Sequence, residues 1–178
     1  RSEMCIRDSL DVEDVKVVRA GAKSQVIVLV DADERPDLDV LEQATYEVSS
    51  ALDAAEARGE ADFGAQGYTL EVSTPGIDAP LTQPRHWRRN RGRIAEISLA
   101  DGSAIAARIG ALSPDEESII LVTSKGPKGR LKAVGQRVQL TNVARAVVQV
   151  EFSNPPAAEK DFAGLDYDDA LTRLEDNK

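Results

Sequence analysis

The N-terminal part of the chain alternates between runs of branched apolar residues and polar stretches. Residues 10–18 and 25–31 are rich in Val, Ile and Leu and are separated by a short glycine-containing stretch, which predicts two antiparallel strands. Residues 68–73 predict a third strand. Between them, 37–58 predicts a helix that stops at Gly59, because apolar residues recur on one face at Leu38, Leu41, Val48, Leu52 and Ala55. We expect an α/β domain in which the helix packs on a small sheet.

In the second half of the chain, apolar and polar residues alternate, which is the period of two expected for β-strands. Residues 95–99 and 105–109 alternate between apolar and polar positions around Asp101-Gly102, a strong hairpin turn. A short helix that contains Pro84 in its first turn precedes them. Further strands are predicted over 118–122, 136–140 and 144–152, where Val148, Val150 and Phe152 would share one side. Five short strands in so few residues predict a small closed β-barrel.

The irregular run from Thr74 to Leu81 divides these two patterns, and the charge changes sign at the same place. Residues 1–81 carry 7 basic and 18 acidic side chains, whereas 82–152 carry 12 basic and 6 acidic ones. We therefore predict an N-terminal domain over 10–81 and a C-terminal barrel over 82–152. Residues 153–178 are acidic and are expected to form a mobile tail. Residues 1–9 are set apart as a doubtful segment.

Composition narrows the classes of function. The 178 residues include one Cys and one His and carry a formal net charge of -9. A disulfide, a cysteine zinc site and most histidine mechanisms are thereby excluded, so we expect neither enzyme activity, nor a cofactor, nor a metal. The few scattered aromatic residues argue against an aromatic platform for bases. With no long apolar run and no signal-peptide pattern, we expect a cytoplasmic protein without membrane contact.

The predicted short helix and the residues after it form the first candidate site. Helical spacing places Arg85, Arg88 and Arg89 on one side, and Arg91 and Arg93 follow. The planar guanidinium group suits phosphate oxygens, so an RNA backbone is the natural partner. The alternative is a solvated basic surface that pairs with the acidic N-terminal domain.

The second candidate is the stretch 123–138, which we predict to be a long loop without acidic residues. Long loops are often binding elements, although a loop that is merely soluble remains the alternative. Its candidate contacts are Lys125, Lys128, Arg130, Lys132 and Arg137.

An acidic run and the single histidine are weaker candidates. Asp31, Asp33 and Asp37 have part of the spacing of a calcium loop, but Pro36 stands where the sharp turn needs glycine. The same carboxylates could hold magnesium for phosphodiester cleavage, yet no nucleophile or base accompanies them. His86 lacks a ligand set, and a packing or contact role is expected for it.

The run TLEVSTPGIDAPLTQPRHWRRNRGR, from Thr69 to Arg93, resembles the signature of the bacterial ribosome maturation factor RimP family, and weaker similarity covers residues 10–152. The resemblance implies an N-terminal α/β domain joined to a C-terminal Sm-like (SH3-like) barrel. It implies a non-catalytic factor, expected to be a monomer, that binds the immature small ribosomal subunit through ribosomal RNA and a basic ribosomal protein. The alternative is an acidic protein-interaction adaptor without RNA contact. The matching interdomain motif comprises Ser73, Pro75, Gly76, Ile77, Asp78, Pro80 and Leu81.

Two positions depart from the family pattern. Ala79 stands where the family usually has a basic residue, which puts a charge contact there in doubt. The segment RSEMCIRDS stands where the family has an amphipathic helix. If this segment is not native, the sheet face that such a helix covers should be exposed.

Overall fold

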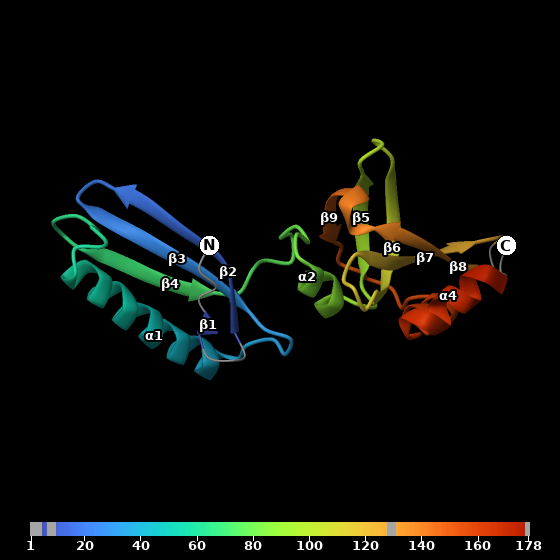
Figure 1. The fold of residues 1–178 in the computed structure, drawn as a ribbon, viewed down its shortest axis with the longest axis horizontal. Coiled ribbons are helices and arrows are strands. Elements are labelled where there is room, and N and C mark those ends of the chain that lie inside the picture. The colour runs from blue at the N-terminus through green and yellow to red at the C-terminus, as the bar shows by residue number, and fades with distance from the viewer. Residues whose placement is uncertain (1–4, 7–9, 128–130, 177–178) are drawn as a thin grey trace. The chain divides into compact units, whose positions relative to one another are not determined.

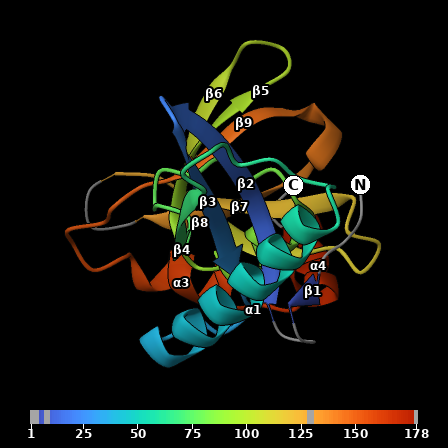
Figure 2. The ribbon, with the colours of Figure 1, turned by 90° about the vertical axis from the view of Figure 1, so that its left-hand side faces the viewer.

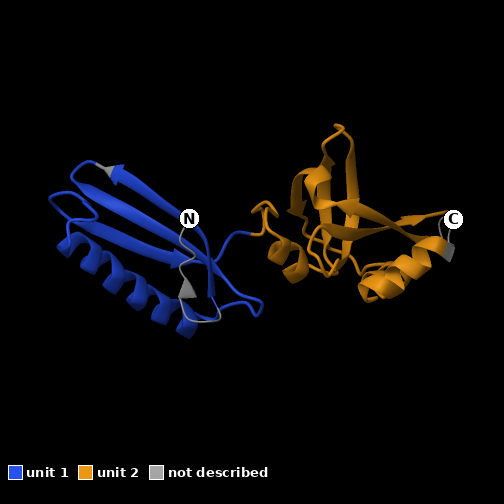
Figure 3. Ribbon diagram, in the orientation of Figure 1, with its two compact units in different colours: residues 1–76 blue, residues 77–178 orange. Residues whose placement is uncertain are grey.

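The chain forms two compact units in the computed structural model, which describes residues 5–6, 10–127 and 131–176. Unit 1 comprises residues 1–76 and unit 2 residues 77–178 (Figure 3). The division lies within the predicted connection but before Leu81. The backbone N–H of Leu81 donates to the carbonyl of Ala146 at 2.9 Å, and its side chain packs against the core of unit 2. Leu81 therefore belongs to the second unit.

Unit 1 has the predicted order of two strands, a helix and a strand, preceded by a short strand (Figure 1). Its elements are β1 (Cys5–Ile6), β2 (Leu10–Ala20), β3 (Lys23–Asp31), α1 (Leu38–Ala57) and β4 (Tyr68–Ser73). The sheet order is β1-β2-β3-β4. Strand β2 is antiparallel to both of its neighbours, whereas β4 is parallel to β3. Helix α1 makes the crossover that a parallel pair requires and lies along one face of the sheet (Figure 2).

The core of unit 1 lies between α1 and β3. Alternation along β3 directs Val26, Val28 and Val30 towards the helix, where Ala44 and Val48 are also buried. The helix begins where the sequence predicts, because the Asp37 carboxylate accepts the Val40 N–H at 2.9 Å. The prediction for Leu38 is wrong, since its side chain is 83% exposed. The helical period places it beside the buried face and not on it.

Strand β2 leaves apolar side chains uncovered on the helix-bearing face of the sheet. Its register pairs Val15 with Val28 and Val17 with Val26, so these side chains point to the same face as the core. Val15 and Val17 are nevertheless 50% and 56% exposed. The helix-bearing face of the sheet is therefore partly uncovered at β2.

Unit 2 contains a five-stranded antiparallel sheet in the order β8-β7-β6-β5-β9 (Figure 1). No pairing between β8 and β9 joins the sheet ends among the described residues, so the predicted closed barrel is not confirmed. The elements are α2 (Pro84–Arg89), β5 (Ile94–Leu99), β6 (Ala104–Leu112), β7 (Ser118–Lys125), β8 (Lys132–Gln139), the 3₁₀ turn η1 (Leu140–Asn142), β9 (Val143–Val148), α3 (Ala157–Ala163) and α4 (Tyr167–Asp176).

Two strand boundaries differ from the prediction. Strands β7 and β8 pair without interruption as far as Lys125 and Lys132, so the expected loop over 123–138 is wrong and the connection is short. Strand β9 ends at Val148, and Phe152 lies beyond it with 96% exposure. Val148, Val150 and Phe152 therefore do not share one strand face.

One face of the unit 2 sheet packs around Trp87 from α2. Its core includes Ile97, Ile109 and Leu121 from three neighbouring strands. The side chain of Trp87 is only 2% exposed, so α2 is anchored to the sheet through this residue.

The other face of the sheet is covered by α3 and α4. Residues 153–178 were expected to be mobile, but their apolar side chains Phe162 and Ala170 pack on Ile120 and Val122 of β7. The middle of β7 is consequently buried on both faces. The approach of the helices is so close at β8 that a Cβ at Gly135 would lie 2.6 Å from both the Phe162 ring and a Leu174 methyl group.

Replacing Gly135 with Ala should destabilise unit 2 by about 1–3 kcal/mol, because the added methyl group overpacks the contact with α3 and α4. Urea unfolding followed by the fluorescence of Trp87, the only Trp in the chain, reports this unit. Gly164→Ala is the matched control, since Gly164 has a negative φ and its nearest neighbour would be 3.3 Å away. Equal losses in both variants would contradict the packing of the helices on β8.

Candidate functional site

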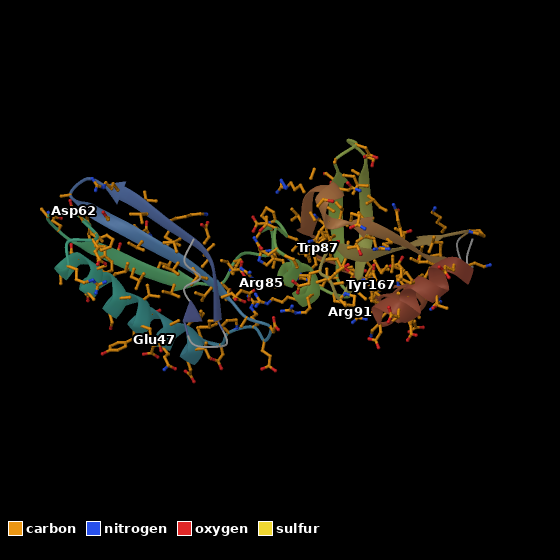
Figure 4. The ribbon with its side chains drawn as sticks, in the orientation of Figure 1. Glu47, Asp62, Arg85, Trp87, Arg91 and Tyr167 are labelled. Carbon is orange, nitrogen blue, oxygen red and sulfur yellow. The ribbon has the colours of Figure 1, made fainter. Side chains whose placement is uncertain are left out.

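Helix α2 presents the first group of predicted site residues. The His86 Nδ1 atom accepts backbone N–H groups of Thr82 at 3.0 Å and Gln83 at 3.2 Å, which fixes the start of the helix. With Trp87 buried, the helical period turns Arg85 and Arg89 away from the core, and Arg88, about 100° around the helix from Trp87, is exposed. Figure 4 labels Arg85 and Trp87 on this helix. The sequence predicts a packing or contact role for His86, and in the structure its ring caps the start of α2.

The nearby ion pair of Arg88 is a surface interaction. Its Nη1 lies 3.5 Å from the Glu116 carboxylate, and both side chains are about half exposed. Exposed pairs of this kind contribute about 0–1 kcal/mol and are readily exchanged for another partner. Arg93 is also exposed, and its guanidinium donates to the Asn90 side-chain oxygen at 3.0 Å. A phosphate oxygen could replace either acceptor.

Arg91 has a structural position that the sequence did not indicate. Its Nε donates to the carbonyl of Ala163 at 2.9 Å, and its Nη2 donates to the carbonyl of Leu165 at 2.5 Å. These carbonyls lie at the end of α3 and in the turn that follows. The Arg91 guanidinium therefore connects the turn after α2 to the C-terminal helices.

The second group of predicted site residues lies at the far end of the β7–β8 ladder. Lys125 and Lys132 are directly opposite in register, and both are exposed. Like charges in this arrangement repel each other, so an anion bound between the two lysines would reduce this repulsion. Lys128 and Arg130 lie outside the described residues. Arg137 donates its Nε to Ser118 Oγ at 3.2 Å, which gives it a structural contact within the sheet.

The predicted interdomain motif runs across the division between the units. Ser73 ends β4, and Leu81 is held by the backbone of β9 and by the unit 2 core. Between these ends, Pro75, Gly76, Asp78 and Pro80 have no helix or strand structure. The motif thus supplies the covalent connection, and the substitution at Ala79 lies within it.

Sequence reasoning missed a buried charge cluster that joins four segments of unit 2. Arg108 on β6 is 2% exposed. Its guanidinium donates to the Glu151 carboxylate at 2.7 and 2.9 Å, to Glu159 on α3 at 3.1 and 3.2 Å, and to the Gly92 carbonyl at 2.9 Å. We call Arg108, Glu151 and Glu159 the Arg108 cluster. Alternation along β6 predicts an outward, solvated arginine at this position, but the segments that carry Glu151 and Glu159 bury it.

The pKa values within the cluster follow from this pairing. The hydrogen bonds and charge of Glu151, together with those of Glu159, hold the pKa of Arg108 above its ordinary value despite its burial. Hydrogen bonds from Arg108 hold the pKa of the Glu151 carboxyl below its ordinary value of 4.5. Arg108 and Glu151 are therefore both charged at neutral pH, and their attraction stabilises the contact between β6 and the segment after β9.

Unit 1 is strongly acidic, and α1 concentrates this charge. The unit contains 17 acidic and 7 basic residues, and the 20 residues of α1 include five acids and no Lys, Arg or His. The helical period places Asp39, Glu42, Asp53 and Glu56 on one exposed face, which we call the acidic α1 face. Like charges at these spacings are mildly unfavourable for the helix. A cationic partner would offset that repulsion.

Neither metal binding nor a membrane helix is indicated by the described part of the chain. It contains no group of three or more His, Cys, Asp or Glu side chains that could hold a metal ion. The acidic run has a different explanation: Asp31 ends β3, and Asp37 caps α1. None of the helices that the structure describes is both long and apolar enough to cross a membrane.

These features define a two-unit α+β protein whose candidate sites are charged surfaces. The family model for the RimP N-terminal domain matches residues 2–78, and this match includes most of the segment 1–9. A ribosome maturation factor RimP of Corynebacterium aurimucosum is 51% identical over 161 residues, which cover 89% of this chain and 83% of that protein. Its counterpart in Corynebacterium diphtheriae is 46% identical over 170 residues, 96% of this chain and 89% of that protein. The chain belongs to the RimP family.

Replacing Glu151 with Gln should destabilise unit 2 by about 1–3 kcal/mol at neutral pH, because a buried guanidinium loses a charged acceptor. Since the pKa of Glu151 is lowered by folding, its stabilisation is complete above pH 4.5 and is lost as the pH falls through its folded value. The difference between wild type and variant in Trp87-monitored unfolding should therefore shrink on acidification. Glu96→Gln on β5 is the control for simple loss of charge, and a pH-independent difference would contradict the assignment.

Proposed function

We propose that this protein is a ribosome maturation factor that binds the immature small ribosomal subunit and assists its assembly without catalysis of its own. The observation that carries the proposal is the similarity to relatives named ribosome maturation factor RimP over nearly the whole chain. We propose that the protein acts in the cytoplasm and is a monomer. An assembly factor of this kind acts by favouring one arrangement of RNA and protein over others, so extensive charged surfaces suit it better than a deep cleft.

In this proposal, unit 2 contacts ribosomal RNA through α2. The anchoring of α2 by Trp87 and His86 supports it, because a fixed helix holds Arg85, Arg88 and Arg89 in position before binding. Arginine donors are well matched to phosphate oxygens. Arg93, Lys125 and Lys132 extend the candidate contacts. The strand order and the 3₁₀ turn before the last strand favour an Sm-like or SH3-like barrel as the underlying fold.

The second part of the proposal is that unit 1 contacts a basic ribosomal protein. The acidic α1 face supports this assignment, because it gathers negative charge on an exposed side of one rigid helix. Complementary charge would speed the encounter and reject wrong orientations. The acidity of unit 1 also favours a second candidate, an adaptor that binds only protein. Binding of the purified chain to naked small-subunit RNA separates the two, because the adaptor should show almost none.

Sedimentation with precursor and mature small subunits tests the proposed function. The wild-type chain should sediment with the precursor and much less with the mature subunit. Changing Arg85, Arg88 and Arg89 together to Ala should weaken precursor binding at least tenfold, because three cationic contacts are lost. Trp87-monitored unfolding should change little. A chain with Arg145→Ala, on β9, controls for the loss of a basic residue elsewhere on unit 2.

Two results would contradict this account of binding. Equal sedimentation with mature and precursor subunits would remove the proposed preference for an assembly intermediate. Unchanged affinity of the triple variant would remove α2 from the RNA-binding surface while leaving the family function intact. A triple Lys variant, which keeps charge but loses the planar fork, should fall between wild type and triple Ala.

The salt dependence of precursor binding gives a second check. About five phosphate contacts predict a slope of roughly -3.5 to -4.5 when the logarithm of affinity is plotted against the logarithm of salt concentration. The slope should become shallower in the triple Ala variant because fewer counterions are released. Filter binding at several potassium concentrations measures both values. Affinity that is indifferent to salt would show that phosphate contacts do not drive the interaction.

A further inference from the structure

Glu116 lies in the turn between β6 and β7 and has an uncommon backbone conformation. Its φ of 58° falls in the left-handed region that favours glycine, and the other residues with a positive φ in the described part of the chain are all glycines. A residue with a Cβ is disfavoured in this region, and Asn tolerates it better than Glu does. A glutamate that is held there despite this cost points to a role beyond the stability of the turn.

Hydrogen bonds hold the turn that carries Glu116 in one conformation. The Glu116 N–H donates to the carbonyl of Ser113 at 2.9 Å, and the Ser118 N–H donates to the hydroxyl of Ser113 at the same distance. Ser113 and Ser118 are both buried, with 4% and 0% exposure. The Glu117 N–H donates to the Asp115 carboxylate at 3.1 Å, which closes the turn from the other side. Glu116 is therefore presented from a fixed turn.

This turn brings the Glu116 carboxylate to Arg88 on α2. The Glu116 Oε1 atom lies 3.5 Å from the Arg88 Nη1 atom, and the two side chains are 52% and 50% exposed. Both residues belong to unit 2. A phosphate oxygen and a carboxylate oxygen are both anionic acceptors that suit a guanidinium group. Because the pair is exposed, a phosphate can reach Arg88, where it competes with Glu116.

We propose that Glu116 is an internal competitor of RNA at α2, because its carboxylate pairs with Arg88 in the free protein and so lowers the affinity of α2 for phosphate. The inference rests on the proposed function and adds regulation of its RNA-binding surface. Exposed ion pairs contribute less to stability than a left-handed glutamate costs, so stability alone does not explain an acid at this position. An assembly factor also has to leave its RNA, and a carboxylate that pairs with Arg88 again favours release.

The direct test replaces Glu116 with Asn, and in a second variant with Gly, and measures filter binding of the full chain to purified small-subunit RNA. Both replacements remove the carboxylate and suit the left-handed conformation, so Trp87-monitored unfolding should show no loss of stability. The affinity for RNA should rise by about two- to fivefold in both variants, the range that a weak surface pair allows. Unchanged or weaker binding would overturn the proposal.

Glu117→Gln is the matched control, because Glu117 is an exposed acid of the same turn. This variant removes one negative charge and leaves the pair between Glu116 and Arg88 intact. Its effect on affinity measures the general repulsion of RNA by the turn, and we expect less than a twofold change. An equal rise in Glu117→Gln and Glu116→Asn would show that net charge limits binding, and the proposal would be wrong.

A double-mutant cycle shows whether Glu116 acts through Arg88. Arg88→Ala alone should weaken RNA binding, because a phosphate contact is lost. In the Arg88→Ala background, Glu116→Asn should give no further rise in affinity, since the group for which Glu116 competes is absent. A rise of the same size with and without Arg88 would contradict the competition.

The same measurements separate this inference from the proposed function. If Arg88→Ala weakens RNA binding but Glu116→Asn changes nothing, the inference fails and α2 remains the RNA-binding surface. If neither variant changes the affinity of a chain that does bind the RNA, α2 is not the contact surface and the inference fails with it, while the assembly role stands. If the wild-type chain does not bind precursor subunits, the proposed function itself fails.

Discussion

The pairing of one buried guanidinium determines how unit 2 is assembled. Burying an unpaired charge costs several kcal/mol, so Arg108 can occupy the interior only with its acceptors in place. Those acceptors are Glu151, Glu159 and the Gly92 carbonyl, which come from the segment after β9, from α3 and from the turn after α2. The position of β6 thereby fixes the turn after α2, the segment after β9 and the start of the C-terminal helices.

The same constraint organises the proposed binding surface. Arg91 adds two hydrogen bonds between the turn after α2 and the end of α3, so the arginine helix and the C-terminal helices are held as one body. The acidic C-terminal segment leaves unit 2 nearly neutral, with 15 basic and 14 acidic residues. Its cationic character is consequently local, which at a screening length of about 8 Å is sufficient to attract a nearby phosphate.

Most elements could be predicted from the sequence because their signals are local. Alternation identified the strands, and the period of apolar residues together with the stop at Gly59 identified α1. The C-terminal helices were not predicted because their segment contains few apolar residues among many acidic ones. The burial of Phe162 and Ala170 depends on contacts with β7, which lies far away in the sequence. The burial of Arg108 could not be predicted for a related reason, because an outward position on a strand is solvated unless a segment from elsewhere in the chain covers it. The arginines of α2 remain candidates proposed from the sequence, whereas the hydrogen bonds of Arg91 to residues 163 and 165 depend on the fold.

The central claim is that the Arg108 cluster holds the C-terminal helices and the turn after α2 against the sheet. Amide hydrogen exchange of a chain with both Glu151→Gln and Glu159→Gln tests it most directly. The account predicts faster exchange over α3, α4 and residues 90–93 at neutral pH, with exchange in β3 and α1 of unit 1 unchanged. Unaltered protection of α3 and α4 in that double variant would contradict the claim.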